Sequence, residues 1–192
     1  MSRSYDFEHL TLFDCAQGPR LWLPLNDGVM GGVSSGALRF GDSNRALFEG
    51  NVSFENGGGF ASVGIPDVPR DLSAFANLEL RVRGDGRTYQ LRLRAGVGVD
   101  DIAYRARFDT EPDRWLTMTV PLASFEATRR GRRLESAPLL PASSIRRLGF
   151  LIGDRQEGPF RLEIAWVRAS GRRIASHCVG GGMKCSTCPV SF

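Results

Sequence analysis

Hydrophobic and polar residues alternate with a period of two along most of the chain, from residue 38 to residue 167. Successive side chains of a strand point to opposite faces, so this period indicates strands with one buried face. The pattern predicts strands at residues 46–54, 102–108, 115–120 and 160–167, and the unbroken apolar run 148–152 is typical of a central strand covered on both faces. Helical periodicity is absent beyond about two turns. The sequence therefore predicts an all-β protein, a two-sheet antiparallel β-sandwich of the jelly-roll type.

The clearest predicted element is a β-hairpin at residues 78–94, which turns at Asp85-Gly86. In that register Val82 faces Tyr89 and Leu80 faces Leu91, so every apolar side chain lies on one face. The opposite face would carry Arg81, Arg83, Arg92 and Arg94, and the next strand adds Arg105 and Arg107 at the same parity. We expect one basic sheet face, either solvated or used to bind a ligand.

Two glycine-rich loops are candidates for binding. The first, at residues 26–32, contains Asn26, Asp27, Met30, Gly31 and Gly32 and follows Trp22; the second, at residues 56–60, contains Asn56, Gly58, Gly59 and Phe60. Glycine permits backbone geometry closed to other residues, and apolar side chains in such loops are costly unless they dock somewhere. Ordinary hairpin turns remain the alternative. If the loops lie together, they form a shared binding edge.

Composition and charge exclude some classes of function. The chain has 192 residues, 42% hydrophobic and 24% charged, typical of one soluble domain. We expect a single domain over residues 1–170 and a flexible Gly- and Cys-containing tail over residues 171–192, with residues 121–144 as a surface loop that carries the arginine run 129–133. The net charge of +4 is a mild surplus, whereas a nucleic-acid binder carries a concentrated basic patch. We therefore expect no nucleic-acid partner.

The location follows from two absences in the sequence. No apolar run approaches the ~20 residues needed to span a bilayer, so we expect membrane contact only through a client. The first fourteen residues lack a secretory signal. We therefore predict a cytoplasmic location.

Few residues could act as catalytic groups or metal ligands. Only His9 and His177 are histidines, and they lie near the two ends, which argues against a histidine-based active site. The tail set His177, Cys178, Cys185 and Cys188 is a weak zinc candidate, and a tail with incidental or redox-active thiols fits better. No phosphate-binding motif is present, and we expect no cofactor. A carboxylate pair for glycoside hydrolysis stays open among Asp27, Asp85, Asp100, Asp101 and Asp154, although turns and strand ends explain each of them.

Taken in order, several motifs resemble the complex I intermediate-associated protein 30 family. They are Trp22 with Asn26-Asp27-Gly28-Val29-Met30-Gly31-Gly32-Val33-Ser34, then Phe48-Glu49-Gly50 with Asn56-Gly57-Gly58-Gly59-Phe60, then Arg83-Gly84-Asp85-Gly86-Arg87 with Tyr89, and finally Trp115 before Val120-Pro121-Leu122. The resemblance covers about residues 13–167. It implies a galactose-binding-like jelly roll that looks like a carbohydrate-binding module and that serves, in mitochondrial members, as an assembly chaperone for respiratory complex I. We expect the chain, unlike those members, to have no transit peptide, and it adds the cysteine tail.

The resemblance implies a set of site residues but no catalytic ones. The set is Trp22, Asn26, Asp27, Met30, Gly31, Gly32, Asn56, Gly58, Gly59, Phe60, Asp85, Tyr89 and Trp115, to which the arginine face adds Arg92 and Arg105. We therefore expect a non-enzymatic binding domain whose partner is a protein client, such as a subunit of a respiratory complex; the oligomeric state is open. The alternatives are a carbohydrate-binding module, with Trp22 and Tyr89 stacking on sugars, and a small enzyme that uses loop carboxylates.

Overall fold

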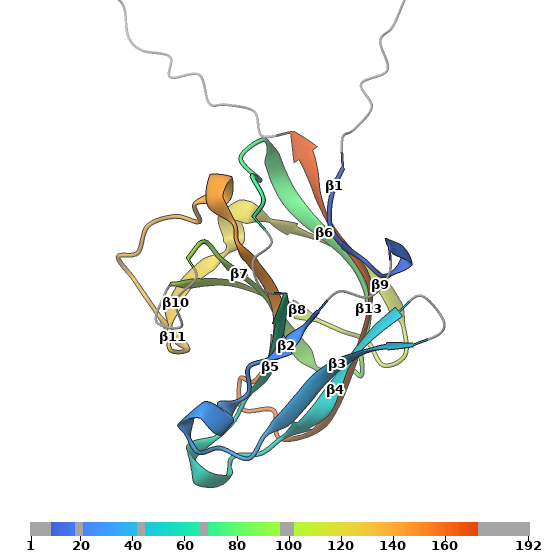
Figure 1. The fold of residues 1–192 in the computed structure, drawn as a ribbon, viewed down its shortest axis with the longest axis vertical. Helices are drawn as coiled ribbons and strands as arrows, with labels where there is room; N and C mark the ends of the chain where they lie inside the picture. The colour runs from blue at the N-terminus through green and yellow to red at the C-terminus, as the bar shows by residue number, and fades with distance from the viewer. Residues whose placement is uncertain (1–8, 18–20, 42–44, 66–68, 97–101, 173–192) are drawn as a thin grey trace, which may run out of the picture.

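The fold consists of two antiparallel sheets packed face to face (Figure 1). The computed structural model describes residues 9–17, 21–41, 45–65, 69–96 and 102–172, with the backbone alone at residues 29 and 30. These residues form thirteen strands and five short 3-10 turns, and they contain no α-helix. The all-β sandwich predicted from the sequence is therefore confirmed. Within this described part, no helix is long and apolar enough to cross a membrane.

The strands divide between the two sheets as follows. Sheet A has the order β3 (Ser35–Gly41), β4 (Arg45–Val52), β13 (Gly158–Arg172), β6 (Phe75–Arg83) and β9 (Trp115–Pro121), and β1 (Leu10–Asp14) pairs with the later part of β13. Sheet B has the order β11 (Arg132–Arg133), β10 (Glu126–Arg129), β8 (Ala103–Asp109), β7 (Thr88–Arg94), β12 (Arg147–Ile152), β5 (Ala61–Ile65) and β2 (Leu23–Pro24). The 3-10 turns are η1 (Cys15–Gln17), η2 (Asp27–Met30), η3 (Glu55–Gly57), η4 (Leu122–Ser124) and η5 (Ala142–Ser144).

The core lies between the inward faces of the two sheets. Its largest fully buried side chains include Tyr89, Phe13, Phe48 and Phe150, which come from both sheets. Trp22 joins this core, because its ring meets that of Phe13 edge-on at 5.2 Å and stacks on that of Phe150 at 5.9 Å between centroids. Aromatic pairs at these separations add to the stabilisation from buried area alone. The run 148–152 is a strand buried at every position, as predicted, and it lies between β7 and β5.

The predicted hairpin at residues 78–94 does not exist. Strand β6 pairs with β13 and β9 in sheet A, whereas β7 pairs with β8 and β12 in sheet B, so the turn at residues 84–87 connects the two sheets. Alternation could not distinguish the two arrangements, because a hairpin and a crossover both turn every second side chain toward the same core. The predicted single arginine face is therefore two faces: Arg81 and Arg83 lie outside sheet A, and Arg92 and Arg105 lie outside sheet B.

Two boundaries also differ from the prediction. The segment 121–144, predicted as a surface loop, contains the β10–β11 hairpin, which extends sheet B. Its turn is Arg130-Gly131, and both residues have positive φ values of 49° and 77°, a combination that suits a tight two-residue hairpin turn. Strand β13 continues to Arg172, two residues into the predicted tail.

Candidate functional site

The two glycine-rich loops meet at one end of the sandwich, where a single carboxylate joins them. Asp27 is fully buried; its Oδ1 accepts the backbone N–H of Ser34 at 3.0 Å, and its Oδ2 accepts those of Gly59 at 2.7 Å and Phe60 at 3.2 Å. In Figure 1 the loops are the blue and teal turns at the lower end, opposite β1 and the end of β13. The two loops therefore form one edge. That this edge binds a partner stays a prediction.

The Asp27 carboxylate is stable in its charged form. Burial by itself raises the pKa of this carboxyl, but hydrogen bonds from Ser34, Gly59 and Phe60 outweigh burial and hold the pKa below its usual value. A carboxylate that accepts several backbone N–H groups is stabilised as the anion. Asp27 is thus charged at neutral pH and satisfies backbone donors that would otherwise be buried without partners.

Asn26 connects the same loop to both sheets. Its side-chain Oδ1 accepts the backbone N–H of Ser62 on β5 at 3.1 Å, and its Nδ2 donates to the carbonyl of Gly36 on β3 at 3.1 Å. The edge strand β3 of sheet A is thereby linked to β5 of sheet B. The Asn26-Asp27 pair therefore connects the 26–32 loop to β3, to β5 and to the 56–60 loop.

The glycines of both loops make room for Asp27. A Cβ atom on Gly32 or on Gly58 would lie 2.5 Å or 2.6 Å from atoms of the Asp27 carboxyl group, far closer than real contacts. Gly31 has a different role, because it ends η2 in the left-handed conformation at φ 90°. Asn56 also has a positive φ, 55°. These residues shape the edge; they were predicted as binding residues, and nothing in their geometry requires a partner.

Three predicted contact residues are buried, which corrects their assigned roles. Trp22 is 7% exposed, and Asp27 and Tyr89 are 0% exposed. The Tyr89 hydroxyl donates to Asp85 Oδ1 at 2.9 Å, and burial, with the adjacent Asp85 charge, raises the pKa of that hydroxyl. Asp85 Oδ2 also accepts the backbone N–H of Arg161 at 2.9 Å. Neither Trp22 nor Tyr89 can stack on a sugar in this structure, and Asp27 cannot touch a client.

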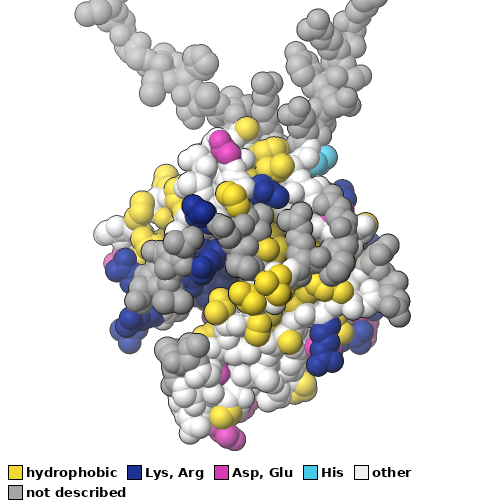
Figure 2. Space-filling model, viewed as in Figure 1, with side chains coloured by type: hydrophobic (Ala, Val, Ile, Leu, Met, Phe, Trp, Pro, Cys, Tyr) yellow, Lys and Arg dark blue, Asp and Glu magenta, His cyan; other side chains and the backbone are white. Residues whose placement is uncertain are grey.

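Exposed apolar side chains lie next to the two loops along the chain. Among the side chains that the structure describes, six large hydrophobic ones are exposed, and five of them flank the two loops in sequence: Leu21 (69%), Leu23 (42%), Leu25 (44%), Val33 (51%) and Phe54 (41%). We call these five the apolar rim. The sixth, Leu139, lies between β11 and η5. Figure 2 shows hydrophobic side chains gathered across the middle of the visible face, around β2.

Sequence reasoning missed the apolar rim, although a signal was present. Leu21, Leu23 and Leu25 alternate with Trp22 and Pro24, and Trp22 turns into the core. Since a strand turns alternate side chains to opposite sides, a buried Trp22 requires its two leucine neighbours to point outward. Exposed apolar residues that stand singly need no explanation, but Leu21, Leu23 and Leu25 follow one another at every second position around β2, where hydrophobic side chains gather in Figure 2.

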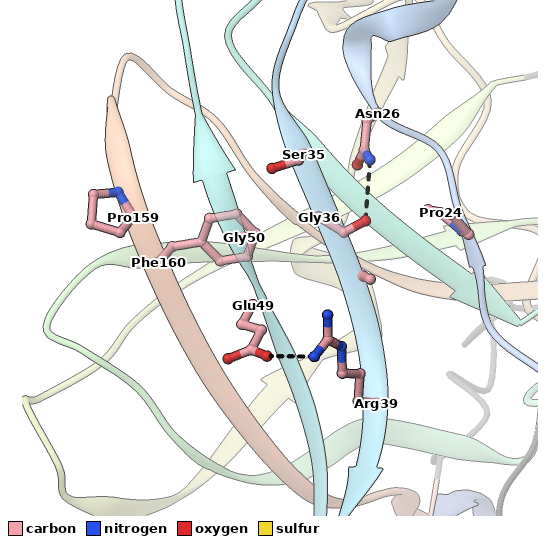
Figure 3. Close-up of a pocket in the computed structure, with 10 residues that line it drawn as sticks. Pro24, Asn26, Ser35, Gly36, Arg39, Glu49, Gly50, Pro159 and Phe160 are labelled. Carbon is pink, nitrogen blue, oxygen red and sulfur yellow. Dashed lines mark hydrogen bonds and ion pairs between the residues drawn. The ribbon is translucent and has the colours of Figure 1, made fainter.

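A groove of about 520 Å³ adjoins the loops, with β3, β4 and β13 on one side and Pro24 on the other (Figure 3). Gly36 and Gly50 face each other across β3 and β4, and Phe160 lies beside Gly50. A Cβ atom on Gly50 would collide with the backbone carbonyl of Ser35, so this close approach requires glycine. The groove extends the edge along sheet A.

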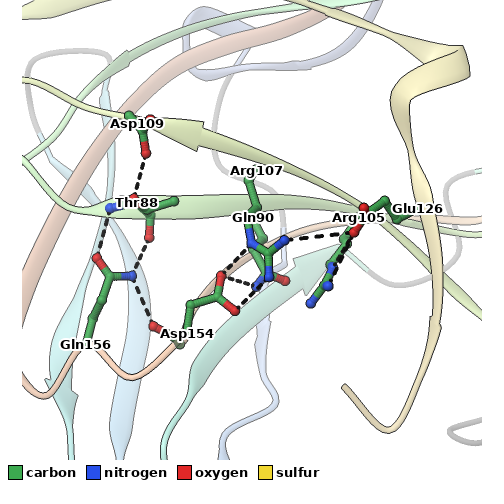
Figure 4. Close-up of polar contacts among 9 residues, drawn as sticks. Thr88, Gln90, Arg105, Arg107, Asp109, Glu126, Asp154 and Gln156 are labelled. Carbon is green, nitrogen blue, oxygen red and sulfur yellow. Dashed lines mark hydrogen bonds and ion pairs between the residues drawn. The ribbon is translucent and has the colours of Figure 1, made fainter. Parts of the chain in front are cut away.

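The outer face of sheet B carries a polar network (Figure 4). The Arg107 guanidinium donates to both carboxylate oxygens of Asp154, at 2.9 Å and 3.1 Å, and Gln90 donates to Asp154 Oδ2 at 2.8 Å. Arg107 lowers the pKa of Asp154 below its usual value. Arg105 donates through Nε and Nη2 to Glu126 Oε2, at 3.3 Å each. Arg105 and Arg107 on this face are therefore paired with carboxylates of the protein itself.

Arg92 differs from its neighbours on this face. It lies directly opposite Arg105, its Nη2 donates to Thr128 Oγ1 at 3.3 Å, and its Nε is buried without a hydrogen-bond partner. Burial, together with the charges of Arg94 and Arg105, lowers the pKa of the Arg92 guanidinium to about 10. Like charges directly opposite each other on a sheet are unfavourable. Arg92 still carries its charge at neutral pH and could pair with an anionic group.

The remaining predicted residues are dispersed. Trp115 lies outside sheet A, directly opposite Arg83 and far from the loops in strand order. Phe60 is partly buried and Asn56 is exposed within the edge. Met30 belongs to η2, but its side chain is outside the described part of the chain, as are the tail residues His177, Cys178, Cys185 and Cys188.

Among the described residues, the loop carboxylates are held in separate contacts. Asp27, Asp85 and Asp154 lie in different loops, and each accepts hydrogen bonds within the fold, while Asp100 and Asp101 lie outside the described residues. In the described part of the chain, no three His, Cys, Asp or Glu side chains are grouped so that they could hold a metal ion. Cys15 is buried, and burial raises the pKa of its thiol to about 11, so the thiol is protonated and unreactive at neutral pH.

The family model that matches this chain and its relatives in sequence carry the same description. A family described as complex I intermediate-associated protein 30 matches residues 11–164. The mitochondrial protein of that name from Mus musculus is 28% identical over 167 residues, which are 76% of this chain and 51% of the relative, and the Drosophila melanogaster protein is 24% identical over 168 residues, which are 76% and 57%. The chain thus spans about half the length of these relatives. Their mitochondrial names contradict the predicted cytoplasmic location, because the absence of a secretory signal carries no information about import into mitochondria.

Solved structures with a similar fold include a carbohydrate-binding module and an agarase. A family 11 carbohydrate-binding module from a Clostridium thermocellum cellulase is 15% identical, with a TM-score of 0.66 over 90% of this chain and 99% of the module. An agarase is 14% identical, with a TM-score of 0.57 over 87% of this chain and 25% of the agarase. At these identities the similarity shows the fold alone.

Proposed function

The chain belongs to the complex I intermediate-associated protein 30 family, and on that premise we propose that it is a non-enzymatic binding domain that assists the assembly of a respiratory complex. Its partner would be a protein client, such as a subunit of a complex related to complex I. The client would bind at the edge formed by the 26–32 and 56–60 loops and the apolar rim. The protein would then act at the place in the cell where its client complex is assembled.

The apolar rim is the observation that carries this proposal. Full burial of a leucine-sized side chain is worth about 1.5–3 kcal/mol, so covering five half-exposed ones yields roughly 5 kcal/mol. Association itself costs a comparable amount in lost translational and rotational freedom. An edge of this kind supports a transient contact that needs further polar interactions, which suits a factor that leaves its client after assembly.

The Asp27 contacts support the proposal in a second way. They hold both loops in one arrangement before any partner arrives. A surface ordered in advance loses less conformational entropy on binding than a flexible one. Asp27, Gly32 and Gly58 would thus act by positioning the rim, and the side chains that touch the client would be Leu21, Leu25 and their neighbours.

The test is capture of the client from cells with the full chain, tagged at its C-terminus, because β13, the last described strand, ends opposite the loop edge (Figure 1). The double variant Leu21→Ser/Leu25→Ser removes two rim side chains, and Leu139→Ser is the matched control because Leu139 is 84% exposed and lies elsewhere. We expect mass spectrometry to find respiratory-complex subunits with the wild type and with Leu139→Ser. With the double variant these subunits should be strongly depleted. Equal recovery with all three folded proteins would refute the assigned edge. Absence of respiratory subunits with the wild type would refute the assembly role.

A carbohydrate-binding module is the second candidate, favoured by the fold shared with such modules and by Arg92 on an outer sheet face. Electrophoresis in gels containing soluble β-glucan would show retardation of the wild type that Arg92→Gln abolishes if the domain binds this glycan class. Mobility unchanged by the glycan would remove the candidate for β-glucans. A small enzyme ranks third, because Asp27, Asp85 and Asp154 are each held in separate structural contacts.

A further inference from the structure

The outer face of sheet A carries a cluster of arginines around one tryptophan. The guanidinium carbons of Arg45, Arg81 and Arg83 lie 5.5 Å, 5.6 Å and 5.6 Å from the centroid of the Trp115 ring. These residues come from β4, β6 and β9, so three strands contribute to one spot. Together with Arg161 on β13, we call them the arginine–tryptophan cluster.

Positive charge exceeds negative charge in this cluster. Glu163 is 5% exposed and accepts hydrogen bonds from Arg83 at 2.5 Å, Arg161 at 3.0 Å and Arg45 at 3.3 Å. Arg81 donates instead to the neutral hydroxyl of Thr117 at 2.9 Å. One carboxylate therefore serves three guanidiniums, and the four arginines with Glu163 carry three net positive charges.

The cluster is ordered without any partner. Contact with the Trp115 ring and with the buried Glu163 carboxylate restricts long side chains that are otherwise free to rotate. The side chains of Arg45 and Arg161 remain 41% and 58% exposed, and the Nε of Arg83 is buried without a partner. A recess of about 290 Å³ lies beside Arg83 and Arg161, but Asp85, Asp113 and Glu163 also line it, so the recess itself is not the basic part of the cluster. Tryptophan and arginine are also the side chains most enriched among residues that dominate protein interfaces.

We propose that the arginine–tryptophan cluster binds an acidic segment of a protein partner, with side-chain carboxylates accepting hydrogen bonds from the guanidinium groups. Planar guanidinium groups match carboxylates with two parallel hydrogen bonds. A peptide fits better than a nucleic acid because Glu49 lies directly opposite Arg161, and Glu79 lies two residues before Arg81 on the same outer face. A continuous phosphate backbone would meet these carboxylates, whereas a peptide can place neutral residues there.

This surface is separate from the loop edge. The acidic segment would belong to a client of the proposed function, but its binding can be measured without that client. The probe is a fluorescein-labelled ten-residue peptide rich in Asp and Glu, with an Asn- and Gln-rich peptide of equal length as the neutral control. Fluorescence anisotropy is recorded with the full chain at two salt concentrations.

Two double variants with the same loss of charge test the position of the site. Arg45→Gln/Arg81→Gln changes the cluster, and Arg132→Gln/Arg133→Gln removes two exposed arginines on β11, at the far edge of sheet B. We expect the cluster variant to weaken acidic-peptide binding about 10-fold or more, and the β11 variant by less than about 2-fold. We also expect binding of the wild type to weaken as salt rises. Thermal unfolding of each variant verifies that it is folded.

Several outcomes would overturn the proposal. One is no binding of the acidic peptide by the wild type, or equal binding of the neutral peptide. Another is an equal loss of peptide affinity in both double variants, because binding would then depend only on the net charge of the protein. The third is tighter binding of an oligothymidylate or of anionic phospholipid vesicles than of the peptide at the same charge concentration. Leu21→Ser/Leu25→Ser should leave peptide binding unchanged, so the cluster and the loop edge can fail independently.

Discussion

Replacing Asp27 with alanine should destabilise the protein and loosen both loops together. The carboxylate accepts three backbone N–H groups, from Ser34, Gly59 and Phe60, in a fully buried position. A hydrogen bond to a charged acceptor contributes about 1.5–3 kcal/mol, and a buried donor left without a partner costs about 1–3 kcal/mol. Alanine removes all three acceptor contacts at once.

The expected loss of stability is smaller than the sum of these values. Hydrogen bonds that share one group are not independent, and the space left by the carboxylate at a loop edge can admit water to the freed N–H groups. We expect the free energy of unfolding to fall by about 3 kcal/mol. For a domain of this size, that corresponds to a melting temperature lower by roughly 6–12 °C.

Thermal and urea unfolding at pH 7 measure this change, and hydrogen exchange locates it. The amides of Gly59 and Phe60 should exchange much faster in Asp27→Ala, because both lose their acceptor. Glu55→Ala is the control, since it removes a carboxylate from the same edge at an exposed position and should change stability by less than about 0.5 kcal/mol. An Asp27→Ala protein as stable as the control, with unchanged protection of the 59 and 60 amides, would refute a structural role for Asp27.

Three further changes have expected outcomes. Gly32→Ala should lower the melting temperature by several degrees because its Cβ meets Asp27, whereas Gly28→Ala, with open space around it, should change it little. Trp22→Ala should reduce the free energy of unfolding by about 3–5 kcal/mol in urea titrations, because the ring is part of the core. The folded-state pKa of Asp27 is lowered, so its stabilisation holds above the unfolded value of about 3.9 and is lost as pH falls through the folded value; acid titrations should show wild type losing its advantage over Asp27→Asn below about pH 4.

The candidate site was only partly predictable from its residues. The Asn26-Asp27 motif and its glycines marked the correct place, because glycine clusters report a backbone requirement wherever they occur. These glycines are required by the fold itself, because Gly32 and Gly58 leave space for the Asp27 carboxylate. From the sequence alone, a carboxylate is expected on the surface. The rim leucines were overlooked because Trp22 was expected to contact a partner, and only its burial in the core indicates that Leu21 and Leu23 point outward.

The period of two by itself determined that the chain forms strands and which side chains face the core, since the alternation of a strand is a local property of its backbone. Which strands pair was decided by the tertiary structure alone. Leu80 and Leu91 face one core whether β6 and β7 form a hairpin or cross between sheets, and only the turn geometry and the competing partners β13 and β8 select the crossing. That selection places Arg81 and Arg92 on opposite outer faces and gathers distant residues into the loop edge and the arginine–tryptophan cluster. Contacts between residues far apart in the chain depend on packing free energy summed over the whole domain, which no local pattern contains.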